Sequence, residues 1–176
     1  MTEPTGTTPT GMKPMSDPTQ TPAKYAEAFA SWRINNPVPE AVDTRLTLEL
    51  ASLRGLSRVR RQVQDFLVSS LGFDRGEDVP AAAEDVVERA VLIIDELTSN
   101  ALRHGSPPAS LHIGDEPGRW IVIVTDSAPD RAPTPARDRP AGQGGYGLYV
   151  IADLTADHGV HYESDRKHVW ACLTKP

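Results

Sequence analysis

The sequence predicts an α+β fold, a two-layer sandwich in which helices cover one face of a mixed, mostly antiparallel sheet. Apolar residues recur at helical spacing in two long segments that follow one another, and short apolar runs typical of strands lie on either side. Turn residues join four of these runs into two hairpins, whose strands are antiparallel. Helices gathered between antiparallel strands indicate a sandwich and not a doubly wound sheet.

The chain divides into a tail and one domain. Residues 1–39 are expected to be a flexible Thr/Pro-rich tail, because its start has almost nothing to bury against the entropy of ordering. Residues 40–176 are long enough for one domain with its own core. The tail allows a short helix over 24–34, which would pack on the protein's own domain or a subunit neighbour, or dock a partner. Three aromatic residues would share one face of that helix: Tyr25, Phe29 and Trp32.

The elements of the domain follow from their periodicity. Alternating leucines predict a strand over 45–50 with one buried face. Helical spacing predicts a first core helix, from a potential cap at Ser52 to Gly72, and a second from near Ala81 to Gly105. The remaining expected ranges are 110–113 and 119–125 for the first hairpin, with its turn at 114–118, 146–156 for a helix, and 160–163 and 168–173 for the second hairpin.

Three further features concern a buried strand, a long loop and a single cysteine. The run from Trp120 to Val124 is apolar on both faces, so it should lie inside the sheet. Residues 127–144 hold many prolines and no periodicity, and such a long loop in a compact domain is usually functional or mobile, so we expect a lid. Cys172 is the only cysteine, and a small buried side chain is its expected role.

Composition limits the partners and the compartment. The formal net charge is −6 and the pI is near 5.3, which disfavours general binding to nucleic acid or to an anionic membrane. No apolar run reaches the roughly 18 residues needed to cross a bilayer, and the polar start lacks the apolar core of a signal peptide. We therefore expect a cytoplasmic protein with no nucleic acid and no membrane among its partners.

The second long helix carries a polar stripe beside its core stripe. Glu96, Asn100 and His104 fall on one line at helical pitch. A carboxylate and a carboxamide on successive turns can hold a water and a hard divalent cation side by side. The alternative is that this stripe is only the solvated face of an amphipathic helix. The core stripe consists of Val87, Ala90, Val91, Ile94, Leu97 and Ala101.

Two candidate binding features follow this helix in the chain. The run from Gly142 to Leu148 is rich in glycine and opens a helix, so its N–H groups and helix dipole could hold phosphates. The alternative is that these glycines serve turn geometry alone. Asp126 ends a buried strand and could accept a hydrogen bond from a ligand amino group, or it caps the strand end.

Taken in order, these residues resemble the GHKL superfamily of ATP-binding proteins, which includes gyrase and the histidine kinases. The stretch Glu96-Leu97-x-x-Asn100-Ala101-x-x-His104-Gly105 is similar to the N box, Asp126 to the G1 box, and Gly145-Tyr146-Gly147-Leu148 to the G2 box. Small size, a basic first helix and no phosphoacceptor-histidine region look most like the anti-sigma-factor serine/threonine kinases. The resemblance covers roughly residues 42–174.

The resemblance implies a role for each matched residue. Asn100 would ligate the Mg²⁺ that bridges the ATP phosphates, and Glu96 would be catalytic by activating the attacking hydroxyl. Asp126 would bind the adenine amino group. The other nucleotide-binding residues that the resemblance implies are Arg103, His104, Gly142, Gly144, Gly145, Gly147 and Leu148.

The resemblance also implies a function. The protein would be a homodimeric serine/threonine kinase that uses ATP and Mg²⁺, inhibits a sigma factor and phosphorylates an anti-anti-sigma protein. Two departures concern adenine more than phosphate: Ala128 stands where relatives usually have glycine, and the closing hairpin reads Arg166-Lys167-His168 where relatives tend to carry Gly-Thr. The alternative is a non-catalytic binding module of the same fold.

Overall fold

The fold is a two-layer α+β sandwich, as predicted. The computed structural model describes residues 26–27, 30–40, 42–74, 76–133 and 147–176. Its five strands form one sheet in the order β1-β2-β3-β5-β4, with every neighbouring pair antiparallel. The parallel pairing seen in the described residues is an isolated bridge between Asn35 and Val160. The strands are β1 (Thr44–Glu49), β2 (Ser110–Glu116), β3 (Arg119–Asp126), β4 (Asp157–Tyr162) and β5 (Lys167–Thr174).

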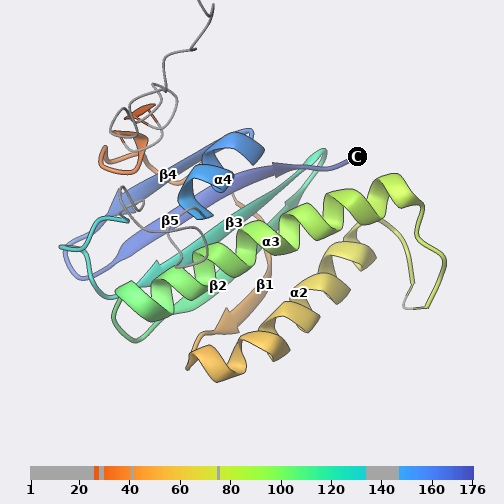
Figure 1. Cartoon of the computed structure of the whole chain (residues 1–176), viewed down its shortest axis with the longest axis horizontal. Helices are drawn as coiled ribbons and strands as arrows, with labels where there is room; N and C mark the ends of the chain where they lie inside the picture. The colour runs from red at the N-terminus through yellow and green to blue at the C-terminus, as the bar shows by residue number, and fades with distance from the viewer. Residues whose placement is uncertain (1–25, 28–29, 41, 75, 134–146) are drawn as a thin grey trace, which may run out of the picture.

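The helices lie together on one face of this sheet (Figure 1). The longest helix, α3, runs across the sheet and contacts α2 on one side and α4 on the other. A short 3₁₀ turn, η1, leads into α2. The described helical elements are η1 (Leu53–Gly55), α2 (Leu56–Ser70), α3 (Ala81–His104) and α4 (Gly147–Leu154).

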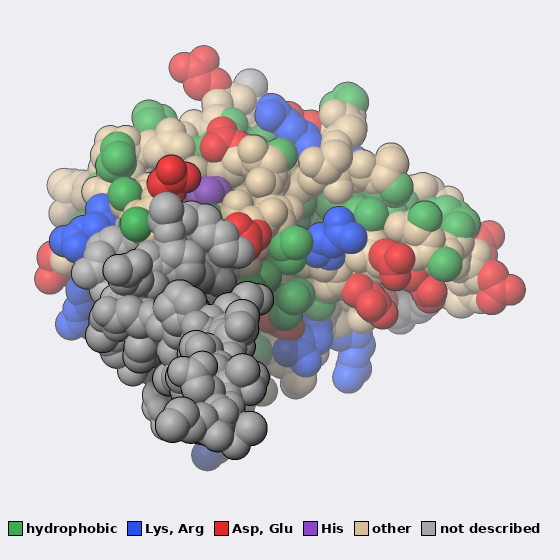
Figure 2. All heavy atoms as spheres, turned by 45° about the horizontal axis from the view of Figure 1, so that its top comes forward, with side chains coloured by type: hydrophobic (Ala, Val, Ile, Leu, Met, Phe, Trp, Pro, Cys, Tyr) green, Lys and Arg blue, Asp and Glu red, His purple; other side chains and the backbone are tan. Residues whose placement is uncertain are grey.

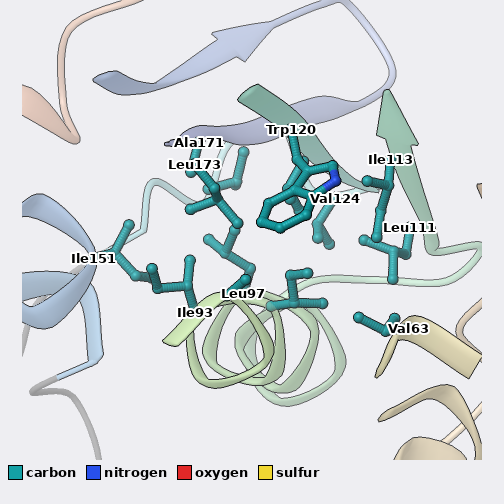
Figure 3. Packing of buried hydrophobic residues seen from close by; sticks show 14 of the residues in the cluster. Val63, Ile93, Leu97, Leu111, Ile113, Trp120, Val124, Ile151, Ala171 and Leu173 are labelled. Atoms are coloured by element: carbon teal, nitrogen blue, oxygen red, sulfur yellow. The ribbon is translucent and has the colours of Figure 1, made fainter. Parts of the chain in front are cut away.

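The apolar stripe of α3 is buried, as the sequence predicted, with Val91 partly buried at its edge. Leu97 of this helix points toward Trp120 of β3 and Leu173 of β5, and Ile93 lies beside Ile151 of α4 (Figure 3). Burial of one such aliphatic side chain contributes roughly 1.5–3 kcal/mol, so this stripe fixes α3 against the centre of the sheet.

The central strand β3 is buried on both faces, which confirms the prediction from its continuous apolar run. Trp120, Val122 and Val124 face the helices. Ile121 lies on the opposite face in a smaller cluster, which also contains buried Cys172. The other members of this cluster are Trp170 and the partly buried Val38, Val42 and Ile123.

Several expected boundaries were wrong, among them that of β4, which begins at Asp157 and not at residue 160. Ser52 makes no side-chain capping hydrogen bond, and Leu53 is 47 % exposed in η1, so α2 begins only at Leu56. The first hairpin is longer than predicted, because Gly114 pairs with both neighbouring strands and does not turn the chain. A Cβ on this glycine would lie 2.4 Å from Val42 Cγ1, so it serves a close approach. The turn itself is at Gly118, whose φ is +77°.

The segment before β1 belongs to the folded core. Trp32 is fully buried and donates a hydrogen bond from Nε1 to the carbonyl oxygen of Leu148, 3.3 Å away. Asn36 Nδ2 donates to His158 O, and Asn36 O accepts from Trp170 Nε1. Trp32 therefore packs on its own domain, which was the first of the sequence interpretations, and it holds the first turn of α4. Tyr25 and Phe29 lie outside the described residues.

The outer surface carries charges of both signs. Basic and acidic side chains are mixed over the described part of the face that Figure 2 shows.

None of the helices in the described ranges combines the length and apolar character needed to span a bilayer.

Replacement of Trp32 by alanine tests whether this segment stabilises the domain. The change removes a fully buried side chain, so we expect the free energy of unfolding to fall by about 3–5 kcal/mol. Denaturant unfolding of the full chain measures this. Ile34→Ala is the matched control, because Ile34 is 65 % exposed and its loss should cost little. Equal stability of both variants would mean that Trp32 is not part of the core.

Acid should destabilise the same region through His158. Its ring lies 4.6 Å from the Trp32 ring, and Ser31 Oγ lies 3.0 Å from its Nε2. Burial lowers the pKa of His158, so the unfolded chain binds the proton more readily than the folded chain. The contribution of His158 is present above the unfolded pKa of about 6.5 and is lost as the pH falls below that value through the lower pKa of the folded protein.

We therefore expect the free energy of unfolding to decrease from pH 7.5 to pH 5, and to decrease less in His158→Gln. His104→Gln, at an exposed position, should keep the wild-type slope. An unchanged slope in His158→Gln would contradict this assignment. Denaturant titrations at each pH supply the values.

Candidate functional site

The polar stripe of α3 meets the first residue of α4. A Cβ added to Gly147 would lie 2.1 Å from Glu96 Oε2, so the backbone at Gly147 packs directly on this carboxylate. Only glycine allows such an approach without displacing the side chain. Glu96 is half-buried and does not lie on a fully solvated face. The predicted carboxylate and the last glycine of the predicted turn are therefore in contact.

Asn100 lies one turn further along α3 and is also half-buried. At a rise of about 1.5 Å per residue, it follows Glu96 by about 6 Å on the same stripe. Arg103 and His104 are exposed in the last turn of the helix. The stripe is thus half-buried at Glu96 and Asn100 and open to solvent at its end.

The end of α3 is held against the end of β3. A Cβ on Gly105 would lie 2.5 Å from Asp126 Cγ, so the backbone of Gly105 packs on the Asp126 carboxylate. The N–H of Ser127 donates to the carbonyl oxygen of Ser106 over 2.9 Å. These contacts bring Asp126 to the same helix as Glu96, about 13 Å away along its axis.

Asp126 carries a partner that the sequence interpretation missed. Lys167 Nζ donates to Asp126 Oδ1 over 2.8 Å and to the carbonyl oxygen of Ala128 over 2.9 Å. The same Asp126 oxygen accepts the N–H of Ala128 over 2.9 Å. The side chains of Lys167 and Asp126 are only 5 % and 1 % exposed, so this ion pair is buried.

A signal for this pair was present in the sequence. Lys167 has the same parity along its strand as Val169, Ala171 and Leu173, which face the helices. Strand alternation alone would therefore have placed the lysine on the helix side of the sheet. What the sequence could not supply is the pairing of β5 with β3, which sets Lys167 opposite Asp126.

Tyr162 completes a row across three strands. Asp126 of β3 pairs in register with Lys167 of β5, and Lys167 pairs with Tyr162 of β4. Among the described residues, the buried Tyr162 hydroxyl has no hydrogen-bond partner. Burial raises the pKa of this phenol, so it is neutral at neutral pH. The row therefore offers a carboxylate, an ammonium and a neutral hydroxyl.

The remaining predicted positions divide into two groups. Gly142, Gly144 and Gly145 lie outside the described residues, as does most of the expected lid. Leu148 is buried, and its carbonyl oxygen accepts the hydrogen bond from Trp32. Within the described ranges, His, Cys, Asp and Glu side chains form no group of three that could hold a metal ion.

The surroundings of Glu96 and those of Asp126 suit a nucleotide to different degrees. At one end, the Gly147 backbone packs on the Glu96 carboxylate, and no side chain stands between them. At the other end, the Asp126 carboxylate already accepts an ammonium and an N–H. A hollow of about 130 Å³ lies elsewhere, at the N-terminal half of α3, and none of the predicted site residues lines it.

Comparison with known families agrees with this geometry. The chain matches the model of the histidine kinase-like ATPase domain over residues 50–173, a range that includes Glu96, Asn100, Asp126 and Gly147. No curated protein matches the chain. Because the matched range spans more than half of the 176 residues, it identifies the family. The chain belongs to the histidine kinase-like ATPase domain family, whose members bind ATP.

Proposed function

We propose that this protein is a serine/threonine kinase of that family, which acts as an anti-sigma factor and phosphorylates an anti-anti-sigma partner in the cytoplasm. The observation that carries the proposal is the contact between the Glu96 carboxylate and the backbone of Gly147, with Asn100 one turn away. These are the positions at which the sequence resembles the N and G2 boxes. Homodimerisation belongs to the same proposal.

The residues of the stripe suit phosphoryl transfer. This reaction needs charge neutralisation and in-line positioning more than covalent help from the protein. Glu96 would accept the proton of an attacking serine hydroxyl, and the Asn100 amide oxygen would hold Mg²⁺. When bound, ATP supplies the phosphoryl group and Mg²⁺ offsets its charge. Arg103 and His104, exposed at the end of the helix, would face a phosphate or the partner protein.

A second function is favoured by one specific observation. The buried pair of Lys167 with Asp126 satisfies the carboxylate that the resemblance assigns to adenine. A chain with this pair suits a non-catalytic module that binds its protein partners with little or no help from nucleotide. Retention of both Glu96 and Asn100 favours the kinase.

Asn100→Ala tests the metal site. Wild type should bind ATP more tightly with Mg²⁺ than without it, and the variant should lose this gain, about tenfold or more, because the amide oxygen that would hold the cation is gone. Equilibrium titration of the full chain, with and without Mg²⁺, measures the effect. Gln64→Ala, which removes an exposed amide from α2, is the control and should behave as wild type. Indifference of wild type to Mg²⁺ would leave the non-catalytic module.

Glu96→Ala tests the proposed base. The variant should still bind ATP but should transfer phosphate to a serine of an anti-anti-sigma domain about 10²–10⁴ times more slowly. Single-turnover transfer to such a domain gives the rate, and a serine-to-alanine acceptor identifies the modified residue. Glu88→Ala, on an exposed part of α3, should transfer normally. Undiminished transfer by Glu96→Ala would remove it from the role of base.

A further inference from the structure

The row of Asp126, Lys167 and Tyr162 has no role in the phosphoryl transfer proposed above. A carboxylate meant for a ligand amino group is expected to have an oxygen available for it. Here the side chain of Asp126 is 1 % exposed and is bonded to an ammonium. The partner ammonium is itself held by a second acceptor, the carbonyl oxygen of Ala128.

The arrangement is rigid for a physical reason. An ammonium on a carboxylate is a charge-assisted hydrogen bond, roughly twice as strong as a neutral one. Because both side chains are buried, separating them would leave two charges without partners in a poorly solvated place. The amino group of adenine is a neutral donor, so it cannot replace Lys167 without a net loss.

The surroundings of the carboxylate reinforce this conclusion. The Gly105 backbone packs against the other oxygen, since a Cβ there would lie 2.7 Å from Asp126 Oδ2. The Tyr162 hydroxyl, next in the row, is buried with no partner in the described part of the chain. A hydroxyl and a lysine can both donate to a ligand acceptor, whereas the one carboxylate that would take a ligand donor is engaged.

We infer that Lys167 is a specificity-determining residue, which removes the preference for a 6-amino purine at the nucleotide site. This inference rests on the proposed function, because it takes Asp126 to be the purine-recognising group. It concerns the base alone. Asp126 lies at the C-terminal end of α3, whereas Glu96 and Asn100 lie further back along the helix, where Gly147 contacts Glu96. The wild-type protein therefore holds ATP and GTP chiefly through their shared triphosphate.

The test compares the binding of Mg-ATP and Mg-GTP by titration calorimetry on the full chain. Wild type should show less than about threefold preference for ATP. Lys167→Met frees the carboxylate for the adenine amino group, and a hydrogen bond to a charged group changes affinity by about 10- to 100-fold. The ATP-to-GTP preference of this variant should rise by that factor. The thermal shift that ATP induces should also grow, since ATP then partners a buried carboxylate.

Two controls separate the charge from general effects. Lys167→Arg keeps a cation beside Asp126 and should keep the wild-type ratio. Lys175→Met removes a lysine at the opposite end of β5, one that pairs with Asp115, and should also keep the wild-type ratio. If Lys167→Met does not fold, Lys167→Gln is used in its place, because the glutamine amide can still donate to Asp126 but carries no charge. The ATP-to-GTP ratio of Lys167→Gln should rise above that of wild type, but by less than is expected for Lys167→Met.

The outcomes distinguish this inference from the proposed function. A wild-type preference for ATP of about threefold or more would overturn the inference and leave the kinase proposal intact. An unchanged ratio in Lys167→Met or its Gln replacement would also overturn it. Binding of ATP by Lys167→Met but not by wild type would overturn the inference that wild type holds both nucleotides through the triphosphate, and would favour the non-catalytic module. If neither ATP nor GTP bound to wild type or to Lys167→Met, both the inference and the kinase proposal would be overturned.

Discussion

The packing of α3 on the central strand β3 is the contact on which the rest of the structure depends. Leu97 of α3 belongs to one hydrophobic cluster with Trp120 and Val124 of β3, and these side chains are nearly or fully buried. This packing leaves the polar stripe of the helix beside α4 and the end of β3. Two glycines then permit close approach, with Gly147 on Glu96 and Gly105 on Asp126. One apolar interface thus sets the position of every candidate ligand-binding group on the helix.

Much of this arrangement could be predicted from the sequence, because it depends on the local periodicity of apolar residues. The core stripe of α3 and the doubly buried strand were visible as patterns of apolar residues. Boundaries that depend on tertiary contacts were less accurate. Gly114 reads as a turn residue, but in the structure it lies within a strand under Val42. Trp32 lies in a segment that reads as a tail, although it is fully buried beneath α4.

The ion pair of Asp126 with Lys167 shows where such prediction stops. The two residues are 41 positions apart, and only the pairing of β5 with β3 brings them together. Removing one partner of a buried pair typically costs about 3–5 kcal/mol, whereas replacing both by apolar groups can be neutral. Stability alone therefore does not require these charges. The pair lies at the strand ends beside Gly105 of α3, where it occupies the carboxylate that the inference above takes to be the purine-recognising group.

The functional unit extends beyond the part of the chain that matches the family. The match begins at residue 50, after β1, yet the Trp32 indole bonds the Leu148 carbonyl in the first turn of α4. That turn begins with Gly147, whose backbone lies against Glu96. The described residues before the family match therefore support the candidate site through two successive contacts, from Trp32 to Leu148 and from Gly147 to Glu96.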